Sequence, residues 1–260
     1  MRIALFSDIH ANLPALEAVL ADMGTRNLDA IYCLGDLVGY APWPNEVVAE
    51  IRKRKIPTIA GNYDEGIGLM SNNCGCAYKT AQDKSLGAVS IGFTNNIISE
   101  ENRQYLRMLP RHIRLTFLDD SKEENKIEAL LVHGSPRKIN EYLFEDRPEK
   151  SFLRLLEEAN ADILFFGHTH KPFHRTLPYE HEGQSRYRHA INIGSVGKPK
   201  DGDNRACYAV LEITPTTKLT QLNSLRVEFV RVAYDTERAA QAVEDSPLPN
   251  EFADMLRKAY

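Results

Sequence analysis

The sequence predicts an α/β protein in which a parallel sheet, covered by helices, is followed by antiparallel strands. Two observations carry this prediction. The first 60 residues alternate short apolar runs with segments whose apolar residues recur at helical spacing, which is typical of a helix-covered parallel sheet. After residue 172, further apolar runs follow one another with only turns between them, which is typical of antiparallel strands.

The elements of the first 60 residues are expected in the order strand, helix, strand, helix, strand. Pro14 lies at the start of the first helical segment, where its fixed backbone angle suits a first turn. Val47, Val48 and Ile51 share one side of the second helical segment. The expected ranges are 2–6, 14–26, 30–34, 45–55 and 56–60.

The rest of the chain is expected to contain more helices before its strands become continuous. Helical patterns cover 79–93, 100–109 and 149–159. Strands are expected at 113–118 and 127–132 around a charged turn at 119–126, then at 163–166, 173–177, 187–193, 208–213 and 225–232. The tail is expected to form two short helices broken at Pro247 and Pro249. We therefore expect one domain over 1–235, with 236–260 as its helical extension.

Composition excludes several classes of protein. With 260 residues, 43% hydrophobic and 26% charged, the chain is long enough for a sizeable core and is not a disordered protein. Its apolar runs are too short to cross a membrane, and no secretory signal is evident. A net charge of −4 argues against a nucleic-acid coat. Four cysteines are too few for a disulfide scaffold, so we expect a reduced, cytoplasmic protein.

Polar side chains follow five of the predicted strands at the point where each strand ends. Because ligands bind beyond the carboxyl ends of parallel strands, we expect these side chains to converge. The neighbouring glycines allow sharp turns and close approach. Each position taken alone would be an ordinary turn or core histidine, but the complete set favours a ligand site. The set is Asp8, His10, Asp36, Asn62, His133, His168 and His170, with Gly35, Gly61, Gly134 and Gly167 beside them.

These residue types suit a centre of two metal ions. Imidazole, carboxylate and amide ligands fit Mn, Fe, Zn, Ni or Co, and no cysteine directly follows these strands. Seven ligands are too many for one tetrahedral ion, but they suit two ions with one carboxylate bridging them. Two ions about 3.5–4 Å apart form the usual clamp for in-line attack at phosphorus.

The series Asp8-x-His10, Gly35-Asp36, Gly61-Asn62, His133-Gly134 and Gly167-His168-x-His170 resembles the calcineurin-like metallophosphoesterase family over residues 1 to about 200. The run 192–197 (Asn-Ile-Gly-Ser-Val-Gly) resembles its small bacterial and archaeal phosphodiesterase branch. The resemblance implies a four-layer α/β/β/α sandwich of two mixed sheets with helices outside.

The resemblance also implies a role for each ligand. One ion would be held by Asp8, His10, Asp36 and His170, and the other by Asp36, Asn62, His133 and His168. Asp36 would bridge the two divalent ions, of which we favour manganese. A hydroxide between the ions would then attack a phosphate ester in line, and the favoured activity is that of a phosphodiesterase.

Two departures from the family pattern bear on the substrate. The family usually has His after the Asn of the third motif, where it helps to protonate the leaving group. Here Tyr63 and Asp64 follow Asn62, and we assign both as catalytic on the resemblance, although Tyr63 is equally well explained as an aromatic wall. A phenol, with an ordinary pKa of about 10, is a weak acid at neutral pH. The leaving group would then have to be acidic already, or His112, His174 or His181 would supply the proton.

The second departure is the absence of the arginine that follows Asp36 in protein Ser/Thr phosphatases and diadenosine tetraphosphatases of this fold. In its place Tyr40, Pro42 and Trp43 form an aromatic rim, on which a base or aryl group would stack, or which only staples the next helix. Arg137 and Lys198 are assigned with Tyr40 to substrate binding, and Lys200 lies near Lys198. Cys74 and Cys76 are a redox or metal-sensing pair, or plain reduced loop cysteines.

Several alternatives remain on the sequence alone. The same site would serve a phosphomonoesterase or a nucleotide phosphatase. A non-catalytic scaffold, such as the retromer subunit of this fold, would be expected to lack ligands, and none is missing here. A nuclease would need a basic stripe, which the sequence does not show. We expect a small phosphate ester as the partner, no membrane and no nucleic acid, and we leave a homo-oligomer open.

Overall fold

The computed structural model describes residues 1–76, 80–117 and 126–260, and its strands form two sheets. The first sheet has the order β2-β1-β8-β9, and the second has the order β3-β4-β5-β7-β6. The strands are β1 (Arg2–Phe6), β2 (Ala30–Cys33), β3 (His112–Phe117), β4 (Ile127–Val132), β5 (Ile163–Phe166), β6 (Phe173–His181), β7 (Gln184–Asn192), β8 (Ala206–Glu212) and β9 (Arg226–Val232). The helices are α1 (Leu13–Gly24), α2 (Pro44–Lys53), α3 (Asn62–Gly68), α4 (Ala81–Ile97), α5 (Glu100–Arg107), α6 (Glu149–Glu158), α7 (Thr236–Glu244) and α8 (Asn250–Lys258).

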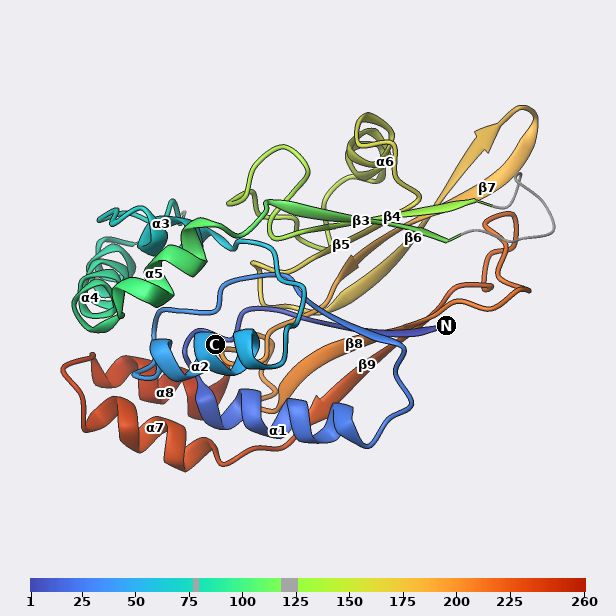
Figure 1. Ribbon diagram of the computed structural model, residues 1–260. Coiled ribbons are helices and arrows are strands. Elements are labelled where there is room, and N and C mark those ends of the chain that lie inside the picture. The colour runs from blue at the N-terminus through green and yellow to red at the C-terminus, as the bar shows by residue number, and fades with distance from the viewer. Residues whose placement is uncertain (77–79, 118–125) are drawn as a thin grey trace.

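The two sheets pack face to face, with α1 outside the first sheet and α6 outside the second (Figure 1). Side chains of β1 alternate between two apolar clusters. Ile3 and Leu5 lie in the cluster between the sheets, and Ala4 and Phe6 lie in the cluster that includes α1. Because both faces of this strand are buried from Ile3 onward, its sequence is apolar from Ile3 to Phe6. The four-layer α/β/β/α sandwich of two mixed sheets is confirmed.

Strand pairing corrects two of the sequence predictions. Residues 56–60 form no strand, because only one parallel bridge joins Cys33 to Thr58, and Pro57 has no N–H to extend a ladder. The C-terminal strands are not wholly antiparallel. The β6–β7 and β8–β9 pairs are antiparallel, but β7 lies parallel to β5, and the two pairs belong to different sheets.

Most predicted helices are confirmed within a few residues of their expected ends, and one helix was missed. Helix α3 begins at Asn62 and has seven residues, too few for a helical apolar period to show in the sequence. Residues 119–125 of the expected charged turn and residue 118 of the strand before it lie outside the described residues, as do the first residue of the helix expected at 79–93 and its two predecessors. In the part of the chain that the structure describes, no helix is long and apolar enough to cross a membrane.

The tail forms two helices, α7 and α8, separated at Pro247 and Pro249 as predicted. They form an apolar cluster together with Ala11 and Ala41, which lie in the loops after β1 and β2. The C-terminal helices therefore pack against the same loops that carry the predicted metal ligands.

Candidate active site

The predicted ligands converge at the carboxyl ends of β1, β2, β4 and β5, which belong to two facing sheets rather than to one. Backbone hydrogen bonds tie the loops together. The N–H of Asp8 donates to the carbonyl of Gly35 (2.9 Å), and the N–H of His10 donates to the carbonyl of Asp36 (3.0 Å). Across the other sheet, the N–H of Gly167 donates to the carbonyl of His133 (2.9 Å). These hydrogen bonds join the ligand loops in two pairs, one at the edge of each sheet.

Left-handed backbone conformation is concentrated at these ligands. The φ angle is +55° at Asp8, +49° at His10, +54° at Asp36, +64° at His168 and +60° at His170. Each such residue is strained by about 1–3 kcal/mol and persists only where its surroundings fix it. Clustering of this strain in one place marks a functional site.

The two carboxylates each have one oxygen fixed by a backbone N–H. Oδ2 of Asp8 accepts from the N–H of His168 (3.1 Å), and Oδ1 of Asp36 accepts from the N–H of Tyr63 (2.8 Å). Their other oxygens face the imidazoles. Oδ1 of Asp8 is buried and has no hydrogen-bond donor among the described residues, and it lies 3.2 Å from Nε2 of His170. Burial raises the pKa of the Asp8 carboxyl, and a cation bound at this oxygen would stabilise its charged form.

His10 and His170 are oriented as ligands by backbone carbonyls. Nδ1 of His10 lies 3.1 Å from the carbonyl oxygen of Val38, and Nδ1 of His170 lies 2.5 Å from that of Lys198. Since a carbonyl can only accept, both Nδ1 atoms carry the proton. Both Nε2 atoms of the neutral rings then present lone pairs, and they face each other at 3.2 Å.

His133 and Asn62 repeat this arrangement on the other side of Asp36. Nδ1 of His133 donates to the carbonyl of Leu34 (2.8 Å). Its Nε2 lies 3.3 Å from Oδ2 of Asp36 and 3.1 Å from Oδ1 of Asn62. The amide nitrogen of Asn62 donates to the carbonyl of Cys74 (2.9 Å), which turns its oxygen toward His133.

The ligand atoms fall into two groups. In each group the atoms lie within 4.8 Å of one another, and every residue is buried. Nε2 of His168 is buried with no hydrogen-bond partner among the described residues. The donor set therefore fits bound cations in both places. One group is Asp8, His10 and His170, and the other is Asp36, His133 and His168.

Electrostatics keep most of these rings neutral. Burial lowers the pKa of His10 and of His168 to about 3, and it lowers the pKa of His170 well below its ordinary range. At His133 the burial effect is outweighed by the charge of Asp36, which raises the pKa to about 10. The charge of His133 in turn outweighs burial at Asp36 and lowers the pKa of that carboxyl. Three neutral imidazoles are thus ready to bind a cation, and the fourth holds a proton that a cation would displace.

Two glycines are required by close approach. A Cβ at Gly61 would lie 2.1 Å from Oδ1 of Asp36, and a Cβ at Gly167 would lie 2.4 Å from Oδ2 of Asp8. No side chain fits at either position without displacing a carboxylate. The prediction that glycines let the backbone approach the site is confirmed at both.

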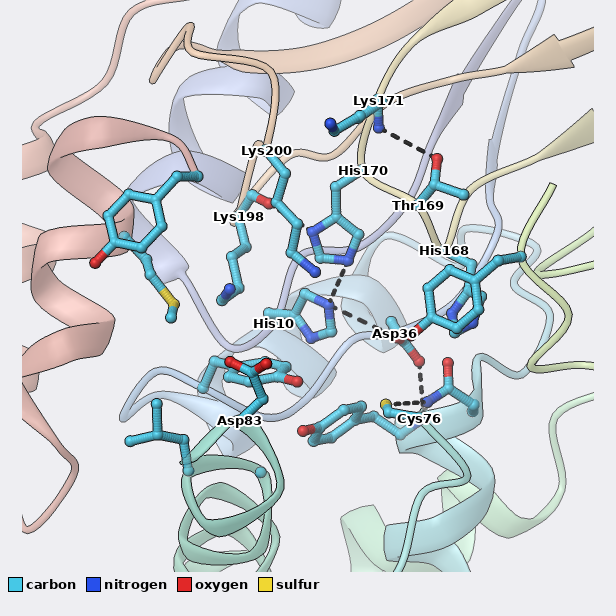
Figure 2. Close-up of a pocket in the computed structure, with 18 of the residues that line it drawn as sticks. His10, Asp36, Cys76, Asp83, His168, Thr169, His170, Lys171, Lys198 and Lys200 are labelled. Atoms are coloured by element: carbon cyan, nitrogen blue, oxygen red, sulfur yellow. Dashed lines mark hydrogen bonds and ion pairs between the residues drawn. The ribbon is translucent and has the colours of Figure 1, made fainter. Parts of the chain in front are cut away.

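The ligands open into a cavity of about 560 Å³. Its size falls in the range of about 300–1,000 Å³ that is typical of small-molecule sites. Five of the candidate ligands line it, and residues of α4 and α8 contribute walls (Figure 2). Its lining includes His10, Asp36, Tyr40, Asn62, Tyr63, Asp83, Tyr142, Phe144, His168, His170, Lys171, Lys198, Lys200, Phe252 and Tyr260.

Comparison with known proteins decides the family. Residues 1–216 match the calcineurin-like phosphoesterase superfamily domain. The chain belongs to this superfamily. It is accordingly a hydrolase of phosphate esters, from a family that depends on metal ions.

Relatives of this phosphoesterase cover its whole length. A protein of Methanocaldococcus jannaschii described as uncharacterized is 33% identical over 264 residues, which is 98% of this chain and 96% of that one. The solved structure of a metallophosphoesterase from Sphaerobacter thermophilus is 29% identical, with a TM-score of 0.71, and the match covers 100% of this chain and 99% of that one. A hypothetical protein of Pyrococcus horikoshii, 21% identical, shares the fold with a TM-score of 0.77 and a match that covers 100% and 98% of the two chains.

The other predicted residues of the phosphoesterase lie in different places. Tyr63 lines the cavity, 5.4 Å from His10 and 4.8 Å from Tyr40 between ring centroids. Lys198 is also in the lining. Arg137 is not, since its guanidinium pairs with Glu141 and it lines a separate cavity of about 350 Å³.

Asp64 lies beneath the loops, outside the described cavity lining. Its Oδ1 accepts from the N–H of Leu37 and its Oδ2 accepts from the N–H of Gly61, both at 2.9 Å. Burial, together with the charge of Asp36, raises its pKa to about 7. Asp64 therefore joins the two loops that carry Asp36 and Asn62, rather than facing a ligand.

Sequence reasoning missed much of the cavity wall. Tyr142 packs on His168 with ring centroids 4.1 Å apart, and Phe144 stacks on Tyr142 at 5.7 Å. Phe252 of α8 contacts Tyr40 at 5.1 Å. None of these residues has a motif, because they come from an irregular loop and a distant helix. The aromatic rim predicted at Tyr40 was the one available signal.

Proposed function

We propose that the protein is a phosphodiesterase that uses two divalent metal ions to hydrolyse a small phosphate ester. The observation that carries this proposal is the position of Asp36 between the two ligand groups. Its Oδ2 lies 3.3 Å from Nε2 of His133 and 3.6 Å from Nε2 of His10. One carboxylate therefore serves both groups, as a shared ligand would.

The geometry above supports an assignment of residues to each ion. Asp8, His10 and His170 would hold one ion and Asn62, His133 and His168 the other, with Asp36 shared. Two such ions, Mn, Fe, Zn, Ni or Co with manganese favoured, would neutralise phosphate oxygens and lower the pKa of a water. The protein's own contribution is to fix seven ligand groups in advance and to bury them from solvent.

The preference for diesters, or for esters with acidic leaving groups, follows from what the cavity wall lacks. Tyr63 stands where an imidazole would protonate a departing alkoxide. None of the described residues that line the cavity is an arginine, whose guanidinium would hold the reacting phosphate in bidentate geometry. The aromatic side chains Tyr40, Tyr142 and Phe144 offer apolar surface for an organic group of the substrate.

Metal analysis and a paired assay test this function. Purified protein should contain about two metal ions per chain after reconstitution with manganese. It should hydrolyse bis-p-nitrophenyl phosphate with a higher kcat/KM than p-nitrophenyl phosphate. Asp36→Asn should lose turnover and metal, whereas Asp245→Asn, an exposed control at the end of α7, should retain both.

The alternatives make different predictions in the same assay. Preference for the monoester would keep the site but favour a phosphomonoesterase or nucleotide phosphatase. Absence of metal and turnover after reconstitution would favour a non-catalytic scaffold. We further propose 1–235 as the catalytic domain and 236–260 as its extension, since α8 supplies Phe252 and is followed by Tyr260 in the cavity wall.

A further inference from the structure

Two lysine side chains enter the cavity from the loop after the run at 192–197. Figure 2 shows Lys198 and Lys200 on one wall, with their side chains directed toward the side where His10 lies. Lys198 is 4% exposed, and Lys200 is half-buried. Buried lysines are rare unless they are paired.

Neither ammonium forms an ion pair with a carboxylate in the part of the chain that the structure describes. The Nζ of Lys198 lies 4.8 Å from the ring centroid of Tyr40, in a cation–π contact. The described lining has two acidic residues, Asp36 and Asp83. The carboxylate of Asp83 accepts a hydrogen bond from the N–H of Thr80 at the start of α4. An anion between the two ammonium groups would supply the charge partner that no described carboxylate provides.

The lysines stand beside the metal-ligand groups and are not part of them. The Tyr40 ring under Lys198 makes an edge contact with His10, with centroids 4.9 Å apart. The carbonyl of Lys198 orients His170, and the N–H of Lys200 donates to the carbonyl of His170 (3.4 Å). An anion held by the two ammonium groups would therefore lie next to the reacting phosphate. A cavity of about 560 Å³ has room for the bound anion and the reacting phosphate together.

We infer that Lys198 and Lys200 bind a second phosphate group of the substrate, adjacent to the phosphodiester that is hydrolysed. This inference rests on the proposed phosphodiesterase function. The substrate class is then a small phosphodiester that carries an additional phosphate, such as a phosphorylated nucleotide ester. In its hydrolysis, water adds to the diester phosphorus, the bond to the leaving oxygen breaks, and a proton is released. The second phosphate is unchanged.

A matched pair of chromogenic diesters tests the inference. Thymidine 5′-(p-nitrophenyl phosphate) lacks a second phosphate, and its 3′-phosphorylated form has one. The wild-type enzyme should favour the phosphorylated form in kcat/KM by about tenfold or more, the scale of one charge-assisted contact. Lys198→Met and Lys200→Met, which keep side-chain length and backbone, should each remove most of that preference. In both variants, kcat/KM for the phosphorylated diester should therefore fall toward that for the unphosphorylated one.

Two controls separate charge from packing. Lys200→Arg should keep the preference, and Lys138→Met, at an exposed lysine outside the cavity lining, should leave both rates unchanged. In wild-type enzyme, thymidine 3′,5′-bisphosphate should inhibit more strongly than thymidine 5′-phosphate, a test that needs no variant. Hydrolysis of the plain diester without any preference for the phosphorylated one would overturn the second-phosphate site alone. Failure of both diesters to react would overturn the proposed phosphodiesterase.

Discussion

The Nε2 atoms of His10 and His170 face each other at 3.2 Å, although backbone carbonyls fix the proton of each ring on Nδ1. Two lone pairs in contact repel, and both rings are buried, so water does not relieve them. A cation bound to both nitrogens reverses the sign of this interaction. The pair is therefore organised for a metal ion before the ion arrives, and the first predictions concern that ion.

Removal of one ligand from each group should remove the two ions separately. His170→Ala and His133→Ala should each lower the metal content from about two ions per chain to about one and lower kcat by at least about a hundredfold, since a two-metal clamp needs both ions. Plasma emission spectrometry and the diester assay measure these quantities. His181→Ala, at an exposed histidine of β6, is the matched control. Unchanged metal content in His170→Ala would contradict the assignment of that ligand.

Metal uptake should release a proton from His133. Because Asp36 raises its pKa to about 10, this ring is protonated at pH 7 in the metal-free protein, and a cation must displace that proton. Metal affinity should therefore fall as the pH falls. Calorimetric titration with manganese in two buffers of different ionisation enthalpy measures the protons released. We expect the wild type to release about one proton per chain from His133 on binding metal. The His133→Gln variant should lack that proton release.

Asp64→Asn should destabilise the fold. The carboxylate accepts two backbone N–H groups, of Leu37 and Gly61, and an amide can accept only one of them on its oxygen. A buried N–H left unsatisfied costs about 1–3 kcal/mol, so the urea midpoint should fall accordingly. The diester should still be hydrolysed at a temperature where the variant is folded. A stable but inactive Asp64→Asn variant would favour a direct catalytic role instead.

Tyr63→His should extend the range of leaving groups. An imidazole with an ordinary pKa of about 6.5 protonates a departing alkoxide near neutral pH far better than a phenol does. We expect kcat/KM for a methyl or alkyl diester to rise on the order of tenfold, with little change for p-nitrophenyl esters, which need no acid. Tyr63→Phe is the control. If Phe lowers the rate on alkyl esters by a hundredfold or more, the phenol of Tyr63 is itself the acid.

The His174–His189 pair should make stability depend on pH. Burial lowers the pKa of His189 from 6.5 to about 3, and the ring lies 3.0 Å from Nε2 of His174, whose pKa burial also lowers. Between pH 6.5 and 3 the unfolded chain therefore binds more protons than the folded one. The contribution of His189 to the free energy of unfolding is fully present above pH 6.5. It is lost as the pH falls, and the free energy of unfolding then drops by up to about 1.4 kcal/mol per pH unit. Urea unfolding at pH 7, 6 and 5 should show a shallower slope for His189→Gln than for wild type.

Short apolar runs in the sequence correctly predicted the strands that are buried on both faces. β5 and residues 3–6 of β1 are apolar because one set of alternate residues packs between the sheets and the other packs against helices. The segment at 56–60 is also mostly apolar, but Pro57 has no N–H to extend a ladder and the segment forms only one bridge. Helix α3 escaped prediction because it has only seven residues. The apolar content of a segment indicates that it is buried. It does not indicate whether the segment pairs with a neighbouring strand by hydrogen bonds.

The sequence by itself determined the candidate ligand types and their order, since each of these residues follows a recognisable local signal: Asp8, His10, Asp36, Asn62, His133, His168 and His170. Tertiary structure decided the rest. Only packing between distant segments could bring Tyr142, Phe252 and Lys200 into one cavity and direct Asp64 to the backbone N–H of Leu37. A metal ligand is marked by short spacings along one loop. A cavity wall arises where surfaces from unrelated parts of the chain meet, and no spacing along the chain records that.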